Sequence, residues 1–292
     1  MPVWSALNRP ETFAALSDED RLQLANALAD ELGAGWAARA PVSESDLPTP
    51  VLLHHAGTDL EFVAVAGGEL QLGISERDYL EWSEIVSDFD PGRLAAQRAA
   101  AEPVHRVLVR PFVCSRTLVT HARIDVLSNG MITPSKWGLL PRAAARQFAA
   151  WLGFRLPSEV ELEWIGRDAG RLHLFAHELL ERAQSSLAEG EEEWVDQDDP
   201  LESFYRVKFV PSRFGVLELV EQQWAEDDWH PNYIGAPSNS EPWLAGDPRG
   251  VYRSDRSIAE AQDENGYVDA LAGNRGIERT EARVRLALPL GA

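Results

Sequence analysis

The sequence predicts an α+β protein in which helices and strands are separated by long irregular segments. Apolar and polar residues alternate over residues 61–66 and 105–110, and this two-residue period is typical of strands. Residues 75–101 and 141–152 instead show helical patterns. The final hundred residues contain little regular pattern, so we expect a low content of regular secondary structure there.

The first predicted element is a helix that begins after Ser17, where an acidic run follows a capping serine. Four residues form its expected apolar face: Leu22, Ala25, Leu28 and Leu32. Gly33 and Gly35 end the helix, and the proline-rich residues 41–50 form an extended connector. We therefore divide the chain into an N-terminal helix and connector, residues 1–50, and a main domain, residues 51–292.

Further along the chain, the helical pattern of residues 75–101 is interrupted by Asp-Pro-Gly at residues 90–92. The next helix, residues 141–152, has proline in its first turn and is rich in alanine. Residues 234–248 are rich in Pro, Gly, Ser and Asn, and we expect them to form a long surface loop.

Residues 154–164 read FRLPSEVELEW and carry the most specific motif of the chain. Ser158 and Glu161 have the spacing of a capping box, which predicts a helix start. With the preceding Arg-Leu-Pro and the following Glu-Trp, the stretch resembles the G-(K/R)-R-L-P-T-E-A-E-W-E signature of the formylglycine-generating enzyme (sulfatase-modifying factor) family.

Other motifs of that family recur here in the family's order. Residues 62–73, FVAVAGGELQLG, and residues 102–113, EPVHRVLVRPFV, resemble its first strands, and residues 214–224, FGVLELVEQQW, resemble its Y-G-L-Y-D-M-x-G-N-V-W motif. Residues 251–255 and 281–285 lie where the family has R-G-G-S-W and G-F-R. The resemblance implies a variant of the C-type lectin fold, with little regular structure and long functional loops.

Composition excludes several classes of partner. The chain has 292 residues and a net charge of −20, which repels nucleic acid and anionic membranes and suits a basic partner. It has one cysteine, no apolar run of about 18 residues and no signal-peptide pattern at residues 1–5. We expect a cytoplasmic protein without a membrane helix.

The resemblance implies copper bound by two cysteines shortly after the R-G-G-S position, because thiolates are the soft ligands that copper(I) prefers. The matching residues 253–262 contain no cysteine. Cys114, in a strand-like segment, is expected to be a buried apolar residue. We therefore expect a pseudoenzyme that lacks the family's copper-dependent oxidation.

The family's calcium site is also altered. Its G-N pair corresponds here to Glu221 and Gln222, and glutamate tolerates poorly the backbone geometry that a glycine implies. Calcium stays possible, and no other cofactor is expected.

An alternative is a non-haem iron site. His173 and His177 are four residues apart and Glu178 follows, so on a helix both imidazoles would share a face. His54, His55 and His121 could complete such a site only through the tertiary fold. This alternative describes an oxidoreductase with bound iron.

Acidic residues gather in two runs, residues 189–199 and 226–228, and we expect both to be solvated loops. Aromatic residues gather in the loop-rich C-terminal third, where they either fill the core or line a recognition cleft. The expected binding residues are Trp224, Trp229, Tyr233, Trp243, Arg253 and Arg256.

The sequence therefore favours a scaffold that binds a protein or peptide, which its acidic surface suggests is basic. The second hypothesis is the iron oxidoreductase. The third is a structural subunit that docks through its N-terminal helix, in which case deletion of residues 1–40 would abolish assembly and leave the main domain folded.

Overall fold

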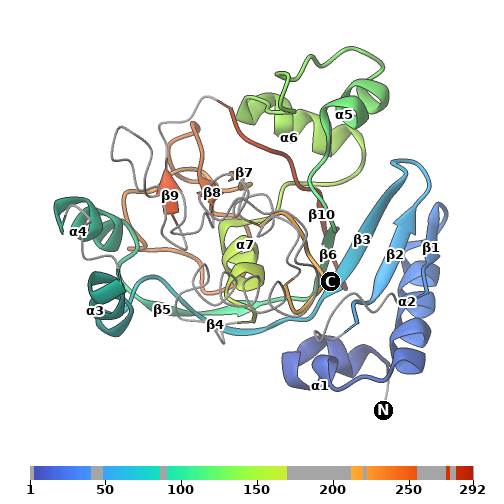
Figure 1. Ribbon diagram of the computed structural model, residues 1–292, viewed down its shortest axis with the longest axis horizontal. Helices are drawn as coiled ribbons and strands as arrows, with labels where there is room; N and C mark the ends of the chain where they lie inside the picture. Colours follow the sequence, from blue (N-terminus) through green and yellow to red (C-terminus); the bar gives the residue numbers. More distant parts are fainter. Residues whose placement is uncertain are drawn as a thin grey trace, which may run out of the picture.

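A five-stranded antiparallel sheet organises the fold (Figure 1). The computed structural model describes residues 3–40, 49–85, 91–169, 212–219, 222–254, 274–276 and 281–291. In spatial order the strands are β1 (Trp36–Ala38), β2 (Leu52–His55), β3 (Leu60–Val65), β6 (Phe112–Ser115) and β10 (Ala287–Pro289). Cys114 of β6 lies between Val63 of β3 and Ala287 of β10. The sheet thus joins segments from both halves of the chain.

The part of the chain that the structure describes also contains two smaller sheets. One pairs β4 (Gly68–Leu72) with β5 (His105–Val109), and the other contains β7 (Gln223–Trp224), β8 (Tyr252–Ser254) and β9 (Asn274–Gly276). All of these pairs are antiparallel. The strands predicted over residues 61–66 and 105–110 are confirmed as β3 and β5.

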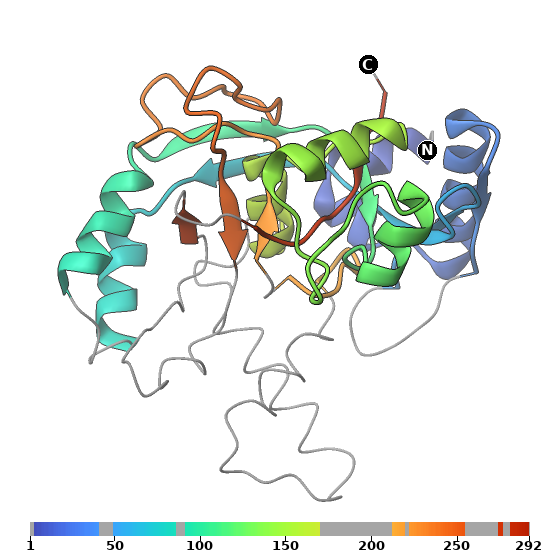
Figure 2. The ribbon, with the colours of Figure 1, turned by 90° about the horizontal axis from the view of Figure 1, so that it is seen from above.

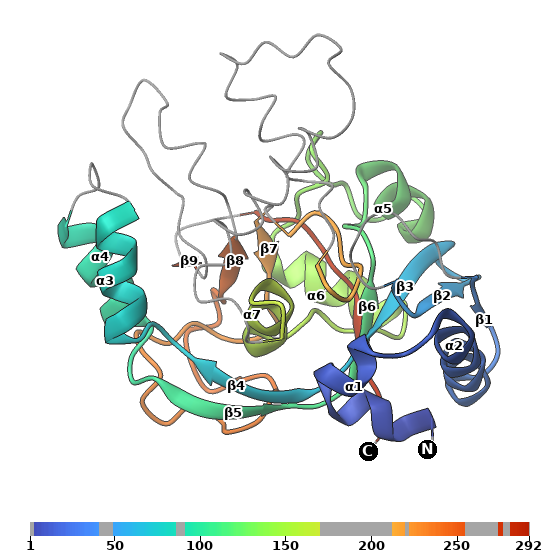
Figure 3. The same ribbon diagram turned by 60° about the horizontal axis from the view of Figure 1, so that its bottom comes forward.

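The helices flank these sheets, and the one nearest the centre, α7 (Glu159–Gly166), contacts β4, β5 and β8 (Figure 3). In chain order they are the 3-10 helix η1 (Val3–Asn8), α1 (Pro10–Ala14), α2 (Asp18–Leu32), α3 (Glu76–Ile85), α4 (Pro91–Ala100), α5 (His121–Ser128), α6 (Arg142–Trp151) and α7 (Glu159–Gly166). The helices predicted over residues 75–101, with their interruption, and over residues 141–152 are confirmed. No helix in the described ranges is long and apolar enough to cross a membrane.

The motif of residues 154–164 forms a helix start, as its spacing predicts. The Ser158 hydroxyl accepts a hydrogen bond from the Glu161 amide at 3.1 Å, and the Glu161 carboxylate accepts one from the Ser158 amide at 2.8 Å. Arg155 holds the same carboxylate with two hydrogen bonds, of 2.6 and 2.5 Å. The capping box is therefore fixed in place by the arginine of the motif, and α7 begins at a defined point.

The N-terminal helix begins at the predicted cap, with the Ser17 hydroxyl accepting from the Asp20 amide. Two residues of its predicted apolar face, Ala25 and Leu28, are buried as predicted. Leu22 is instead 37% exposed, whereas Leu24 is fully buried. The prediction is wrong for Leu22 because α2 packs against η1, β1 and β2 together, so its buried side is set by these partners. β1 pairs with β2 across the predicted domain boundary at residue 50.

The difference between Leu22 and Leu24 gives a direct test of which side of α2 is buried. Leu24→Ala should lower the free energy of unfolding by about 2–5 kcal/mol, because it leaves a cavity beneath α2. Leu22→Ala, on the same helix, should change it by only about 0.5 kcal/mol, as is usual for a surface substitution. Urea unfolding followed by tryptophan fluorescence measures both values. Equal losses of unfolding free energy for the two variants would contradict the burial of Leu24 and the exposure of Leu22.

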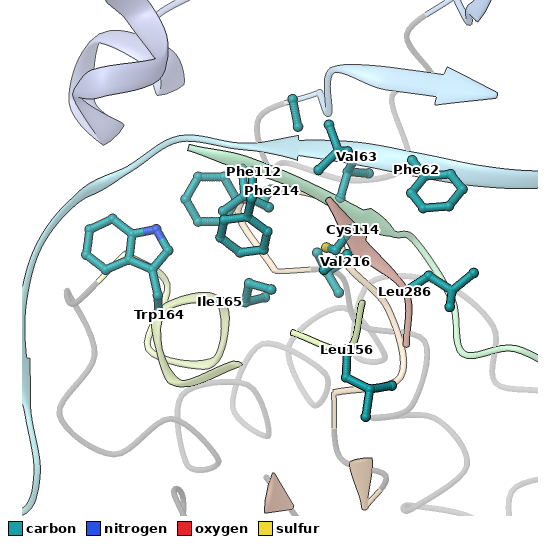
Figure 4. Packing of buried hydrophobic residues seen from close by; sticks show 14 of the residues in the cluster. Phe62, Val63, Phe112, Cys114, Leu156, Trp164, Ile165, Phe214, Val216 and Leu286 are labelled. Carbon is teal, nitrogen blue, oxygen red and sulfur yellow. The ribbon is translucent and has the colours of Figure 1, made fainter. Parts of the chain in front are cut away.

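The main core lies between the five-stranded sheet and α7 (Figure 4). Phe62, Phe112, Trp164 and Phe214 are among its largest fully buried side chains. Cys114 lies among them and is completely buried, as expected. Burial raises the pKa of its thiol to about 12, so the sulfur stays protonated at neutral pH.

Candidate functional site

The acidic run at residues 226–228 is buried, so the expectation of a solvated loop is wrong for it. Glu226, Asp227 and Asp228 are 8%, 4% and 8% exposed. Arg146 of α6 donates to the Glu226 carboxylate at 2.6 Å, and the Leu156 amide donates to the other oxygen at 3.2 Å. Such partners offset the cost of burying a charge.

Arg142 of α6 fixes both ends of the segment that follows this run. One of its terminal nitrogens donates to the carbonyl oxygens of Glu226 and Asp227, at 2.6 and 2.8 Å, and to the Asp228 carboxylate at 3.1 Å. The other donates to the carbonyl of Pro248 at 2.7 Å. Residues 226–228 and residue 248 are therefore held by one guanidinium. We call the segment between them, residues 229–247, the anchored loop.

The Asp227 carboxylate ties the anchored loop to the start of α7. It accepts hydrogen bonds from the amide of Trp243, at 2.8 Å, and from the amide of Glu159, at 2.6 Å. The Tyr233 hydroxyl donates to the Glu159 carboxylate at 2.9 Å. Burial, and secondly the negative charge of Glu159, raise the pKa of Asp227 to about 7.

The four aromatic residues of the predicted binding site occupy two different environments. Trp224 and Tyr233 are core residues, 1% and 3% exposed, and the Trp224 indole donates to the carbonyl of Leu140. Trp229 and Trp243 are half-buried. Trp229 packs beside a small buried cluster. Trp243 stacks on the His230 ring, with ring centroids 3.4 Å apart.

One of the two predicted arginines lies within the described residues. Arg253 lies in β8, opposite Gln223 of β7, and Gln223 precedes Trp224. Arg256 lies outside the described residues. The assignment of the aromatic and arginine set to partner binding stays a prediction.

Exposed apolar side chains on the anchored loop were not singled out from the sequence. Ile234 is 73% exposed and Leu244 is 53% exposed. Ile234 lies between Tyr233 and Gly235, and Leu244 lies between Trp243 and Ala245, so neither belongs to a periodic helix or strand pattern. Ile234 follows Trp229 by five residues and Leu244 follows Trp243 directly, so each has a half-buried tryptophan nearby in the chain.

Backbone hydrogen bonds hold the anchored loop in several places. Trp229 and Asp247 exchange two bonds of 2.9 Å across its base. Its middle lies along β5, where the Leu108 amide donates to the carbonyl of Ser238 and the Ser240 amide donates to the carbonyl of Leu108. The loop predicted over residues 234–248 is thus irregular but fixed.

A groove of about 730 Å³ borders the anchored loop. Its walls come from the start of α3, the end of α4, the segment leading into β5, and residues 232 and 234 of the loop. The loop is joined to the opposite wall where the Tyr233 amide donates to the carbonyl of Glu102 at 2.7 Å.

In the part of the chain that the structure describes, the histidines considered for an iron site do not form one common site. His54 pairs with Asp59, and His121 contacts the carbonyl of Ser135. His55 lies in an aromatic cluster with Trp36 and Phe62. No group of three His, Cys, Asp or Glu in the described part of the chain is arranged to hold a metal ion. His173, His177 and Glu178 lie outside that part.

The stretch corresponding to the family's calcium motif contains two buried amides. Gln222 and Gln223 are 7% and 2% exposed, and Glu221 lies outside the described residues. The Gln223 side chain accepts from the Arg285 guanidinium at 2.7 Å and donates to the carbonyl of Glu218 at 3.3 Å. Its amide is therefore part of a hydrogen-bond network with Arg285.

Arg285, which corresponds to the arginine of the G-F-R motif, is fully buried. One terminal nitrogen donates to the carbonyl oxygens of Ser115 and Arg116, at 2.6 and 3.1 Å. The other donates to the carbonyl of Leu217 at 2.6 Å. Arg285 therefore joins the end of β6 to the segment before β7.

Among solved structures, PvdO from Pseudomonas aeruginosa matches with a TM-score of 0.50 and 18% identity, over 80% of this chain and 95% of that chain. The chain has a PvdO-like fold. PvdO has a formylglycine-generating-enzyme-like fold, so the similarity supports a mixed α+β fold of this kind with antiparallel sheets. Treponema denticola variable protein 1 aligns with a TM-score of 0.42 and 14% identity, over 79% of this chain and 96% of that chain. No family model and no curated protein matches the sequence.

Proposed function

We propose that the protein is a divergent member of the formylglycine-generating enzyme family, with that family's variant of the C-type lectin fold, and that it acts as a protein- or peptide-binding module. The observation that carries this proposal is the exposure of Ile234 and Leu244 on the anchored loop. Leu244 follows the half-buried Trp243 directly, and aromatic residues are enriched in protein interfaces.

Fixation of the anchored loop supports the same proposal. A loop that is ordered before binding loses less conformational entropy when a partner binds, so more of the contact energy contributes to affinity. Arg142 and Asp227 hold the loop from below, and β5 holds its middle. Trp229 and Trp243 can then present their partly exposed rings in a fixed orientation.

Copper chemistry is not part of the proposal. Copper(I) in this family is held by a pair of thiolates, and the chain has one cysteine. That residue, Cys114, is buried in the sheet and its thiol stays protonated at neutral pH. Fold similarity alone does not supply an activity.

The proposal is tested by panning a random peptide library on the immobilised full chain. The enriched peptides are then synthesised and their affinities measured by fluorescence polarisation. We expect Ile234→Ser with Leu244→Ser to weaken binding by about tenfold or more, because each removed aliphatic anchor contributes about 1 kcal/mol.

Val126→Ser is the matched control, since Val126 is 68% exposed on α5, away from the anchored loop (Figure 1). It should leave the affinity unchanged. Circular dichroism confirms that the variants remain folded. Failure to enrich any peptide on the wild-type chain would contradict the binding function, and an equal loss in Val126→Ser would contradict the assignment of the site.

A further inference from the structure

The groove beside the anchored loop combines two features that would fit one kind of side chain. It lies at the end of the molecule where α3 and α4 stand together (Figure 2). Its wall carries an exposed acidic cluster and an apolar strip. Ile234 belongs both to this groove and to the anchored loop.

The acidic cluster consists of Glu76, Glu102 and the arginine between them, Arg98. Arg98 donates through its Nε to the Glu102 carboxylate at 2.8 Å and forms an ion pair with Glu76 through a terminal nitrogen. The guanidinium also lies over the ring of Tyr79, 4.9 Å from its centre. Two carboxylates around one guanidinium leave a net negative charge.

Both carboxylates can receive a further cation. The side chains of Glu76 and Glu102 are 64% and 46% exposed, whereas that of Arg98 is 27% exposed. An ionised carboxylate has about four acceptor positions, so each group has capacity beyond its bond with Arg98. A guanidinium or ammonium group entering the groove would meet carboxylate oxygens that have acceptor positions left beside Arg98.

The apolar strip lies next to these carboxylates. Val104 is 36% exposed and Ile234 is 73% exposed, and Pro103 also lines the groove. Ile74, at 4% exposed, lies deeper. Lysine and arginine place their methylene stems along apolar surface and keep their charged ends on polar groups. A groove with carboxylates beside aliphatic side chains therefore has contacts for both the stem and the charged end of a lysine or arginine side chain.

We propose that the groove binds a basic side chain of a peptide partner, with an aliphatic residue beside it. The proposal rests on the proposed function, because it names the partner chemistry of the same binding face. Glu76 and Glu102 hold the cationic group, and Val104 and Ile234 contact its stem and the neighbouring aliphatic residue. The net charge of −20 attracts such a peptide from a distance and raises the association rate.

The test uses two labelled peptides, acetyl-Gly-Leu-Arg-Leu-Gly-amide and its counterpart with Glu in place of Arg. We expect the Arg peptide alone to bind the full chain, more weakly at high salt. Glu76→Lys with Glu102→Lys should weaken this binding by about tenfold or more, because like charge then meets the peptide. Glu76→Gln with Glu102→Gln keeps hydrogen-bonding groups beside Arg98 and should give a smaller loss.

The control is Glu19→Lys with Glu31→Lys on α2, at the opposite end of the molecule (Figure 3). It changes the net charge equally and should leave most of the affinity. An equal loss in the control, or equal binding of the two peptides, would overturn the groove assignment. If peptides obtained by panning lose affinity in Leu244→Ser and not in the Glu76 and Glu102 variants, the groove is wrong and the binding function stands. If panning yields no binder, the proposed function itself fails.

Discussion

Replacing Arg285 with methionine is expected to lower the free energy of unfolding by about 3–5 kcal/mol, which would be a large fraction of the stability of a domain. The guanidinium is fully buried and donates to the carbonyl oxygens of Ser115, Arg116 and Leu217 and to the side chain of Gln223. Methionine fills similar space but donates no hydrogen bond, so these buried oxygens would lose their partner. Urea unfolding measures the loss.

Arg249→Met provides the comparison. Arg249 has a side chain that is 68% exposed, and it pairs with Asp247 at 2.6 Å. Exposed ion pairs contribute at most about 1 kcal/mol, so this variant should be nearly as stable as the wild type. Similar losses for Arg285→Met and Arg249→Met would show that the buried hydrogen bonds of Arg285 do not govern stability.

Asp227 is expected to make the protein less stable as the pH rises through neutrality. Its pKa is about 7 in the folded chain and near 4 in an unfolded one. Between these values the folded state binds more protons than the unfolded state, so stability falls with rising pH. The stabilisation that protonated Asp227 gives to the folded state is fully present below about pH 4 and is lost above about pH 7. It amounts to about 4 kcal/mol.

The measurement compares the wild type with Asp227→Asn in urea unfolding across this pH range. A constant offset is expected from altered hydrogen bonds to Trp243 and Glu159, and it does not affect the slope. The stability of the wild type relative to the variant should fall as the pH is raised from about 4 to about 8. A difference that stays constant over this range would contradict the raised pKa.

Asp247→Asn is the control, because folding lowers the pKa of Asp247, whereas it raises that of Asp227. Hydrogen bonds from Arg249 lower the pKa of Asp247 to about 2. Its contribution to stability is therefore present above its ordinary pKa near 4 and is lost only as the pH falls through about 2. Between pH 4 and 8 the comparison of wild type with Asp247→Asn should show no slope.

Elements with local signals could be predicted from the sequence. Ser158 and Glu161 determine the start of α7 within one helical turn, and the alternation at residues 61–66 predicts β3. The burial of Ala25 and Leu28 on α2 could also be predicted, but the exposure of Leu22 could not. Leu22 and Leu24 are equally apolar, and the choice between them depends on β1 and β2, which follow later in the chain.

The site could be predicted less well than the fold, because its partners are far apart in the sequence. Residues 226–228 look like a solvated acidic run until Arg142 and Arg146, on a helix about eighty residues earlier, are placed beneath them. The groove likewise joins residues 74–104 to residues 232–234.

The order of strands in the main sheet has a consequence for synthesis on the ribosome. β6 can pair with β3 as soon as both have emerged, but its other side waits for β10, which the ribosome makes much later. Throughout that interval β6 presents a row of unpaired backbone groups, which is the kind of edge that joins strands from neighbouring nascent chains. Ribosomes closely spaced on one message would expose such edges side by side, so the spacing of translating ribosomes affects how much chain aggregates before it folds.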